Sequence, residues 1–189
     1  MKITATTIPE VLLLVPKKWG DARGYFVETY RKDLLSKAGV DIDFLQDNQS
    51  LSATRGTVRG LHFQTPPHAQ AKLVRVLAGS VYDVAVDIRA GSQSYGRWVG
   101  ATLTAEGGEQ LLVPRGFAHG FCTLEPDTIV AYKVDGYYAP ECDAGLFWAD
   151  ATLGVDWPVR REDAVVSDKD GKLPPIAGFR SPFVYGDVS

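Results

Sequence analysis

The stretch from residue 72 to residue 134 most constrains the fold, because short runs rich in β-branched and aromatic residues alternate there with turn residues. Runs of this length and spacing indicate an antiparallel sandwich or barrel rather than alternating strands and helices. We therefore expect an all-β, antiparallel jelly roll with a few short helices. The expected strands are Lys72–Leu77, Val81–Ile88, Trp98–Leu103, Gln110–Val113, Phe117–Leu124 and Thr128–Val134.

The rest of the chain predicts little regular structure. Arg31–Ala38 is typical of a helix, with Gly39 as its C-terminal cap. After Trp157 the periodicity is weak and turn residues are frequent, so the segment from about residue 158 is expected to wrap over the barrel as loops and short helical pieces. A length of 189 residues suits one domain that spans positions 1–189.

Composition excludes several classes of function. A net charge of -3 lacks the basic footprint of a nucleic-acid-binding protein. The longest early apolar run, Val11–Val15, is too short for a membrane span or a signal-peptide core, so we expect a cytoplasmic protein without membrane contact. Cys122 and Cys142 form no CxxC pattern, which predicts that both are reduced and non-catalytic.

Three side chains that could share one catalytic cavity flank the proline turn at residues 65–67. Arg59, His62 and Lys72 bring a guanidinium, an imidazole and an ammonium to what we expect to be neighbouring strands. An imidazole with an ordinary pKa of about 6.5 accepts a proton at neutral pH. Because an ammonium can stabilise the oxyanion that such a proton transfer creates, these groups predict chemistry at a carbon next to a carbonyl.

One further motif bears on metal binding. Pro114 to His119 has the form P-x-G-x-x-H, which resembles the second half of the cupin motif of jelly-roll proteins. The upstream histidine pair of metal-binding cupins is replaced by His68-Ala-Gln70, with the cationic Lys72 nearby. Transition metals prefer neutral imidazoles and carboxylates, and the dinucleotide and P-loop motifs are absent, so we expect no metal and no other cofactor.

Taken together, motifs along most of the chain resemble the dTDP-4-dehydrorhamnose 3,5-epimerase family. The resemblance extends from about Ile8 to Pro174. Its motifs are Asp21-Ala-Arg-Gly24, Gln46-Asp-Asn48, Arg59-Gly-Leu-His62, Gln70 to Arg75, Asp83 to Arg89, Pro114 to Phe121, Tyr132-Lys133, Trp157-Pro158 and Ser167 to Asp170.

The resemblance implies a reaction and four catalytic roles. The substrate would be a dTDP-4-keto-6-deoxyhexose, in which the carbonyl acidifies the hydrogens on carbons 3 and 5. His62 would remove a proton, Lys72 would stabilise the enolate oxygen, and Tyr132 would return a proton to the opposite face. Asp170 would orient His62 and raise its basicity. The resemblance also implies a homodimer.

It further implies a set of substrate-binding residues. His119 would line the sugar pocket, and Arg23 and Arg59 would hold the diphosphate through bidentate contacts. The residues matched to the nucleotide end of the substrate are Glu28, Gln46, Asn48, Tyr138, Asp143 and Lys169. Asp143 stands where relatives often carry a longer acidic side chain.

Several alternatives stay open at the level of sequence. Asp168 competes with Asp170 as the partner of His62, and Tyr137 competes with Tyr138 as the ring that stacks on the base. Arg23 and Glu28 could instead form a surface ion pair. For function, the alternatives are an epimerase that inverts one carbon only, a 3,4-ketoisomerase of the same class of sugar nucleotide, and a sugar-binding jelly roll without turnover.

Overall fold

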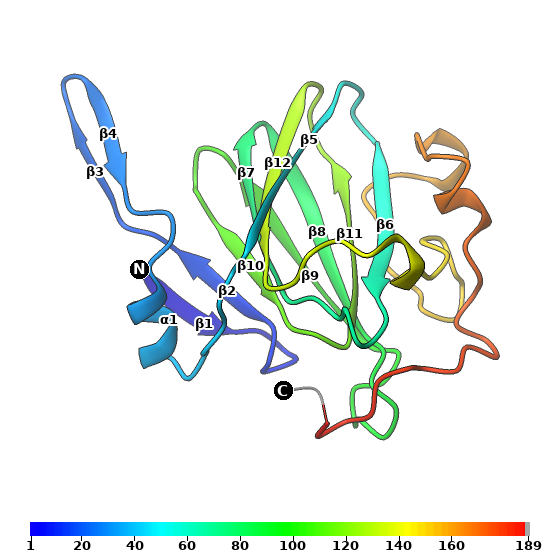
Figure 1. Cartoon of the computed structure of the whole chain (residues 1–189). Helices are drawn as coiled ribbons and strands as arrows, with labels where there is room; N and C mark the ends of the chain where they lie inside the picture. Colours follow the sequence, from blue (N-terminus) through cyan, green and yellow to red (C-terminus); the bar gives the residue numbers. More distant parts are fainter. Residues whose placement is uncertain (188–189) are drawn as a thin grey trace.

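Two antiparallel sheets face each other in the computed structural model, which describes residues 1–187, and this confirms the predicted jelly roll (Figure 1). The six-stranded sheet has the order β1 (Lys2–Ala5), β2 (Leu12–Val15), β10 (Gln110–Val113), β7 (Lys72–Ala78), β12 (Thr128–Val134) and β5 (Gln46–Ser52). The five-stranded sheet has the order β13 (Asp143–Gly145), β6 (Val58–Gln64), β11 (Phe117–Thr123), β8 (Ser80–Asp87) and β9 (Trp98–Thr104).

The core between the sheets explains why the predicted strands form where they do. All six strands expected between residues 72 and 134 are present, with ends that differ by one residue at most. Alternate residues of each strand point to the same face of a sheet, so the apolar positions of a strand are buried together. The residues that meet between the sheets include Val74, Val76 and Val130 from one sheet and Val81, Ala85, Val99 and Phe121 from the other.

Helix α1 (Lys32–Lys37) confirms the one predicted helix. Gly39 follows it with a φ of 84°, a left-handed conformation that glycine adopts without steric cost. The N–H of Gly39 donates to the carbonyl of Ser36, and the N–H of Val40 donates to that of Leu35. This pair of bonds is the Schellman motif that ends many helices. Gly39 therefore ends the helix in the way that the sequence predicts.

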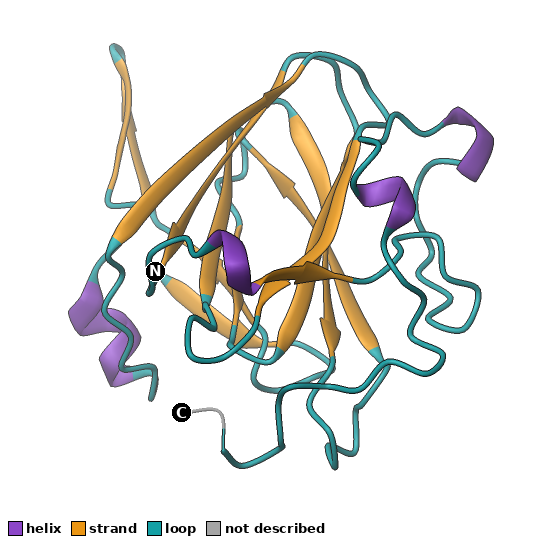
Figure 2. Ribbon diagram, turned by 45° about the vertical axis from the view of Figure 1, so that its right-hand side comes forward, coloured by secondary structure: helices purple, strands orange, loops and turns teal. Residues whose placement is uncertain are grey.

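The segment after Trp157 runs over the outer face of the five-stranded sheet (Figure 2). It contains two short 3-10 helices, η2 (Arg161–Asp163) and η3 (Asp170–Lys172), and a third, η1 (Pro140–Cys142), precedes β13. Phe179 and Phe183 pack edge-on against Phe63 of β6, with ring centroids 5.8 and 5.9 Å away. The segment therefore supports the strand that also carries His62.

A two-stranded hairpin projects from the rest of the molecule (Figure 1). It consists of β3 (Lys18–Asp21) and β4 (Gly24–Val27), which pair only with each other among the described residues. Trp19, Tyr25 and Phe26 of this hairpin are 44%, 61% and 67% exposed. Two strands alone are only marginally stable in water. Exposed aromatic side chains on such a hairpin are therefore a feature that needs an explanation.

Two other expectations concern the chain as a whole. Within residues 1–187 no helix has the length and apolar character needed to span a bilayer, and a cytoplasmic location stays a prediction. Cys122 and Cys142 are both buried and free of a disulfide. Burial raises the pKa of the Cys122 thiol to about 11, which keeps that group protonated at neutral pH.

The packing of the C-terminal segment predicts a stability difference between two adjacent residues. Phe183 is 3% exposed, whereas Val184 is 52% exposed. Phe183→Ala should lower the free energy of unfolding by about 3 to 5 kcal/mol, because it removes a ring from a packed cluster. Val184→Ala should change it by about 0.5 kcal/mol or less. Urea unfolding of both variants measures the difference, and equal effects would show that the segment is not packed as described.

Candidate active site

A cavity opens between the two sheets, where side chains from both of them converge. Two adjoining spaces of about 450 and 520 Å³ share His62, Lys72, Tyr132 and Lys169 in their walls. The expectation that His62 and Lys72 lie on neighbouring strands was wrong in one respect. Strands β6 and β7 are consecutive in sequence but belong to opposite sheets, so the two side chains approach the cavity from different sides.

An irregularity in β6 brings Arg59 and His62 to the same face. Residues three apart in a regular strand point to opposite faces. Against β11, however, Arg59 pairs with Phe121 and His62 pairs with His119, so β6 has an extra residue between these positions. Such a bulge reverses the alternation of side chains, and Arg59 and His62 both line the cavity.

Glycine makes this bulge possible. Gly60 has a φ of 127°, and a Cβ at this position would lie 2.6 Å from the Cα of Gly120 and 2.8 Å from the carbonyl oxygen of His119. Only glycine allows both the backbone conformation and the close approach of β11. Gly60 belongs to one of the motifs of the resemblance, but its role in a bulge was not predicted, although a glycine inside a strand pattern is a known signal for one.

His62 and Asp170 form a hydrogen-bonded dyad. His62 Nε2 lies 2.7 Å from Asp170 Oδ1, and the Gly60 N–H donates to Asp170 Oδ2 at 3.1 Å. Asp168, the competing carboxylate, is exposed. Burial alone would raise the pKa of Asp170, but the hydrogen bonds from His62 and Gly60 hold it below its ordinary value. An ionised carboxylate only accepts, so Nε2 carries the proton and Nδ1 of His62 is left as a base.

Lys72 is a half-buried cation with no carboxylate in direct contact among the described residues. Its Nζ donates to the carbonyl oxygen of His62 at 3.4 Å, and no salt bridge of this side chain is formed within residues 1–187. Burial lowers the pKa of Lys72 to about 8, against the opposing charges of Asp83 and Asp143. The group is therefore mostly protonated at pH 7 and responsive to a nearby negative charge.

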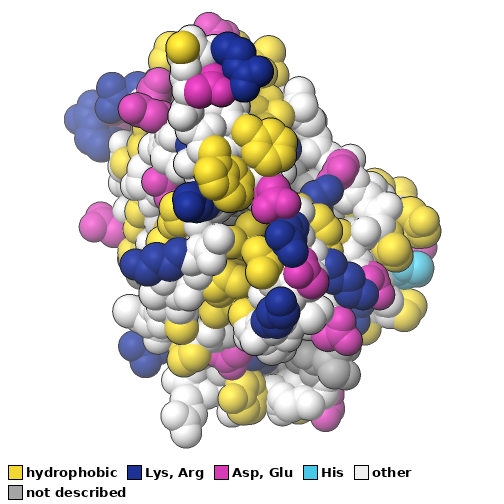
Figure 3. Space-filling model, turned by 90° about the vertical axis from the view of Figure 1, so that its left-hand side faces the viewer, with side chains coloured by type: hydrophobic (Ala, Val, Ile, Leu, Met, Phe, Trp, Pro, Cys, Tyr) yellow, Lys and Arg dark blue, Asp and Glu magenta, His cyan; other side chains and the backbone are white. Residues whose placement is uncertain are grey.

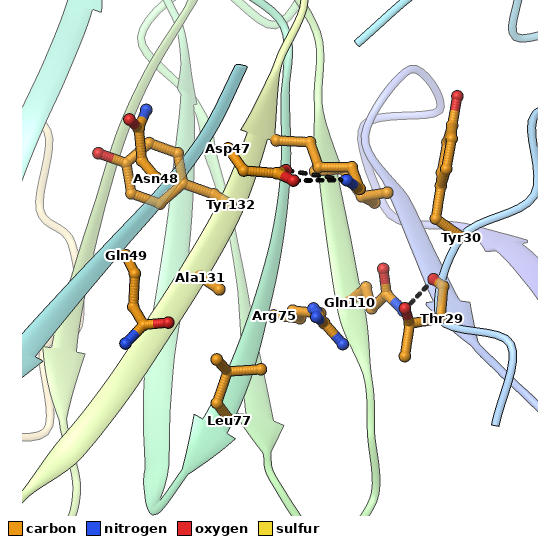
Figure 4. Close-up of a pocket in the computed structure, with 12 residues that line it drawn as sticks. Thr29, Tyr30, Asp47, Asn48, Gln49, Arg75, Leu77, Gln110, Ala131 and Tyr132 are labelled. Atoms are coloured by element: carbon orange, nitrogen blue, oxygen red, sulfur yellow. Dashed lines mark hydrogen bonds and ion pairs between the residues drawn. The ribbon is translucent and has the colours of Figure 1, made fainter. Parts of the chain in front are cut away.

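Tyr132 faces the cavity from the other sheet. It lies on β12 opposite Asn48 of β5, and the two are drawn together in Figure 4. Burial raises the pKa of the Tyr132 phenol, while the charge of Arg59 acts in the opposite direction. The hydroxyl consequently keeps its proton at neutral pH and can act as a donor.

His119 and Asp83 form a second histidine–carboxylate pair, in this case deeply buried. His119 Nε2 lies 3.0 Å from each oxygen of Asp83, whose side chain is fully enclosed. Burial lowers the pKa of His119 despite the nearby carboxylate. At neutral pH the imidazole is therefore neutral and donates to Asp83. Asp83 was not predicted from the sequence as a site residue.

The remaining predicted binding residues of the cavity gather around its mouth. Arg59 donates to Ser52 Oγ at 3.1 Å and to the carbonyl of Leu51 at 3.0 Å. Tyr138 lines the cavity, whereas Tyr137 is not among the lining residues. Hydrogen bonds join the others in pairs: Gln46 with Asn48, Tyr138 with Gln46 and with Asp143, and Lys169 with Asp143.

Arg23 and Glu28 do not line this cavity. Arg23 sits at the projecting hairpin with its side chain 90% exposed and bonds to Asp21 at 2.6 Å. Glu28 contacts Arg31 at 3.5 Å. The two do not form the ion pair that was considered as an alternative, and a substrate-binding role for them stays a prediction.

Another cavity of about 340 Å³ borders the six-stranded sheet (Figure 4). Asp47 and Lys133 form an ion pair of 2.8 Å in its wall, and Gln110 donates to the carbonyl of Thr29 at 2.7 Å. Its lining contains no histidine. It therefore lacks the base that the cavity between the sheets contains.

One group of described residues has metal-ligand character. Potential ligand atoms of His68, Glu141 and Cys142 lie within 4.8 Å of one another. None of the three is among the residues that line the cavity between the sheets. Both nearby histidines, His62 and His119, are instead bonded to carboxylates. The expectation of a metal-free reaction stays a prediction.

Comparison with known proteins gives consistent matches. A family model described as dTDP-4-dehydrorhamnose 3,5-epimerase matches residues 5–178. The chain is 49% identical over 188 residues to the dTDP-4-dehydrorhamnose 3,5-epimerase of Sinorhizobium fredii, which covers 100% of this chain and 96% of that protein. It is 34% identical over 174 residues to a dTDP-4-dehydrorhamnose 3-epimerase of Streptomyces niveus, covering 92% of this chain and 84% of that protein.

Solved structures agree with these matches. The dTDP-4-dehydrorhamnose 3,5-epimerase of Bacillus anthracis, with TDP and PPi bound, superposes with a TM-score of 0.89 and 50% identity, over 92% of this chain and 98% of that chain. The dTDP-6-deoxy-D-glucose-3,5-epimerase of Legionella pneumophila, in complex with dTDP-4-keto-L-rhamnose, gives a TM-score of 0.91 and 39% identity, over 97% of each chain.

The electrostatics of Lys72 predict a titration that can be measured without substrate. NMR of labelled lysine side chains should show one ammonium with a pKa of about 8. In Asp83→Asn the pKa of Lys72 should fall by about one unit or more, because a nearby negative charge that favours the ammonium is removed. The asparagine oxygen can still accept from His119, so the change isolates the charge.

The matched control for this titration is Asp87→Asn. Asp87 lies on the same strand, is equally enclosed and pairs with Arg89 at 2.7 Å. This change should leave the Lys72 titration in place. An equal shift in both variants, or none in Asp83→Asn, would contradict the assignment of Asp83 as the charge that supports Lys72.

Proposed function

The chain belongs to the dTDP-4-dehydrorhamnose 3,5-epimerase family, and we propose that it inverts carbons 3 and 5 of a dTDP-4-keto-6-deoxyhexose in the cavity between its sheets. One observation carries the mechanism. A histidine from the five-stranded sheet and a tyrosine from the six-stranded sheet line the same space, together with a buried lysine. A sugar ring between the sheets would meet a base on one face and an acid on the other.

The first step is removal of a proton. The carbonyl at carbon 4 acidifies the hydrogens on carbons 3 and 5, because the resulting negative charge is delocalised onto oxygen. Nδ1 of His62 accepts the proton, and the imidazolium that forms is stabilised by the carboxylate of Asp170 at 2.7 Å from Nε2. This arrangement follows the logic of other histidine–carboxylate pairs, in which the carboxylate fixes the tautomer of the base.

The second element is stabilisation of the enolate. Lys72 is mostly charged at pH 7, since its pKa is about 8. A fixed cation in a buried site stabilises developing negative charge far more than the same cation would in water. The enolate oxygen at carbon 4 would supply the close counter-charge that Lys72 lacks among the described residues.

The last step is proton return from the opposite side. Burial raises the pKa of Tyr132, so the phenol holds its proton until a strongly basic carbon is presented to it. Delivery from the sheet opposite His62 would invert the carbon. The same pair can act at carbons 3 and 5, because both are adjacent to the carbonyl and yield the same enolate oxygen.

The mouth of the cavity suits the dTDP group. Arg59 is the arginine that lines the cavity, and its guanidinium would bind phosphate oxygens. Gln46, Asn48, Tyr138, Asp143 and Lys169 line the adjoining space and would contact the nucleoside. His119 would contact the sugar through the face not bonded to Asp83.

A homodimer would account for the exposed hairpin. Figure 3 looks onto the side of the molecule from which the hairpin projects, where hydrophobic side chains interleave with charged ones. Exposed aromatic clusters of this kind commonly mark protein interfaces. If a second copy covers Trp19, Tyr25 and Phe26, the neighbouring Arg23 can reach the cavity of that copy and bind its diphosphate.

Two related reactions remain as alternatives, an epimerisation at one carbon and a 3,4-ketoisomerisation. NMR of the product formed in deuterated water separates them. Deuterium at carbons 3 and 5 of a product with both centres inverted supports the proposed function. Deuterium at one carbon only would indicate a single epimerisation, and a carbonyl at carbon 3 would indicate a ketoisomerisation. Either result would contradict the proposed function.

The roles of base and acid predict different exchange behaviour. His62→Asn should abolish both inversion and exchange of substrate hydrogen with solvent. Tyr132→Phe should still allow exchange while inversion falls by about 10² to 10⁴-fold, the usual contribution of a positioned general acid. Tyr82→Phe, on the side of β8 that faces the C-terminal segment, is the control and should leave both rates unchanged. Normal inversion in Tyr132→Phe would reject tyrosine as the acid.

Action of Arg23 across the dimer predicts complementation between two damaged chains. Arg23→Gln alone should lower kcat/KM by roughly 10- to 100-fold, the effect of losing a charged hydrogen bond. Mixed with inactive His62→Asn chains under subunit exchange, it should recover about a quarter of normal activity, because half of the dimers then contain one complete site. No recovery in mixtures that sedimentation shows to be dimeric would rule out action of Arg23 across the dimer.

A further inference from the structure

One side-chain oxygen in the catalytic cavity has no protein partner. Ser50 Oγ is buried and forms no hydrogen bond, the single such side-chain atom among the described residues. Most buried polar atoms in folded proteins are hydrogen-bonded, because burial without a partner carries a free-energy penalty. An exception in a catalytic cavity therefore calls for a functional explanation.

The register of the six-stranded sheet places Ser50 beside the catalytic residues. Ser50 lies opposite Val130 on β12, and the next inward pair of the same two strands is Asn48 with Tyr132. Ser50 and His62 both line the space of about 520 Å³. Its free donor and acceptor thus lie where the sugar ring would bind.

Ser52 offers a direct contrast on the same strand. It lies two residues on, so its side chain points to the same face of the sheet. Its oxygen accepts a hydrogen bond from Arg59 Nε at 3.1 Å. Ser52 therefore holds Arg59, the guanidinium proposed to bind the diphosphate. Ser50, the next serine on the same face, has its hydroxyl available for another partner.

We propose that Ser50 is a specificity-determining residue that hydrogen-bonds the hydroxyl on carbon 2 of the hexose. This inference rests on the proposed function. Carbon 2 adjoins the anomeric carbon that bears the diphosphate, which matches the position of Ser50 next to the Ser52–Arg59 pair. The hydroxyl on carbon 3 changes position when that carbon inverts, whereas the hydroxyl on carbon 2 stays in place throughout. A bond to it can hold the ring through both inversions.

The test compares Ser50→Ala with the normal enzyme on two unreactive ligands, dTDP-6-deoxyglucose and its 2-deoxy analogue. By calorimetry, Ser50→Ala should bind the first ligand about tenfold more weakly and the second within about twofold of normal. With the 4-keto substrate, kcat/KM should fall by a similar factor. Because binding is measured without turnover, the result does not depend on the reaction being the one proposed.

Ser52→Ala is the matched control. It should weaken both ligands by the same factor, since it acts through Arg59 and the diphosphate common to both. The unliganded Ser50→Ala protein should keep or raise its midpoint of thermal unfolding, because an unpaired buried hydroxyl is removed. Equal loss on both ligands in Ser50→Ala, unchanged affinity for both, or a marked drop in that midpoint would overturn the proposal.

Discussion

The carboxylate of Asp170 is the link on which the geometry of the cavity depends. Its two oxygens bond to the ring of His62 and to the backbone N–H of Gly60, at 2.7 and 3.1 Å. The first bond sets the tautomer of the base, and the second occupies the N–H of a bulged residue that is not part of the regular strand pairing. The C-terminal segment that carries Asp170 thus holds both the ring of His62, the proposed base, and the bulge at Gly60 that turns this ring toward the cavity. Removal of the Asp170 carboxylate would leave the buried N–H of Gly60 without a partner, which is costly, and would free the ring of His62.

Two buried carboxylates of β8 have close hydrogen-bonding partners, whereas the ammonium of Lys72 has no carboxylate in contact among the described residues. Asp87 is held by Arg89 and two serines, and Asp83 is held by His119. Buried charges in proteins are ordinarily paired in this way. Lys72 is buried without such a carboxylate in contact, and burial depresses its pKa as a result. In the proposed mechanism, a substrate that develops negative charge next to Lys72 would relieve the unfavourable burial of this cation.

The sequence was sufficient for the parts of the fold that local patterns determine. The strands between residues 72 and 134 and the capped helix were predicted because alternation, turn residues and a C-terminal glycine act locally. The bulge at Gly60 was missed because the local glycine signal does not show that β11 approaches there, with Gly120 lying 60 positions away in the chain. The placement of His62 and Lys72 on opposite sheets was missed for a similar reason, since sheet membership depends on long-range pairing.

The site shows the same division. All predicted site residues except Arg23 and Glu28 line the cavity, and they were found through a resemblance that covers most of the chain. Ser50 and Asp83 were not singled out, because nothing in their local sequence distinguishes them from ordinary strand residues. Their significance comes from their surroundings in the fold: the hydroxyl of Ser50 is buried without a hydrogen-bond partner among the described residues, and Asp83 bonds to a buried imidazole. Arg23 and Glu28 were matched by motif, but one copy of the chain keeps them away from the cavity.

Because His62 and Tyr132, the proposed base and acid, lie on different sheets, the apolar core between the sheets helps to position them. Hydrogen bonds fix the register within each sheet, but only side-chain packing sets the distance between sheets. Phe121 belongs to that core and also forms part of the cavity wall next to His62. The gap that His62 and Tyr132 must span is therefore determined by the same valines and phenylalanine that stabilise the fold. Since protein interiors are close-packed and compress little, the separation of the two groups is held without any direct bond between them.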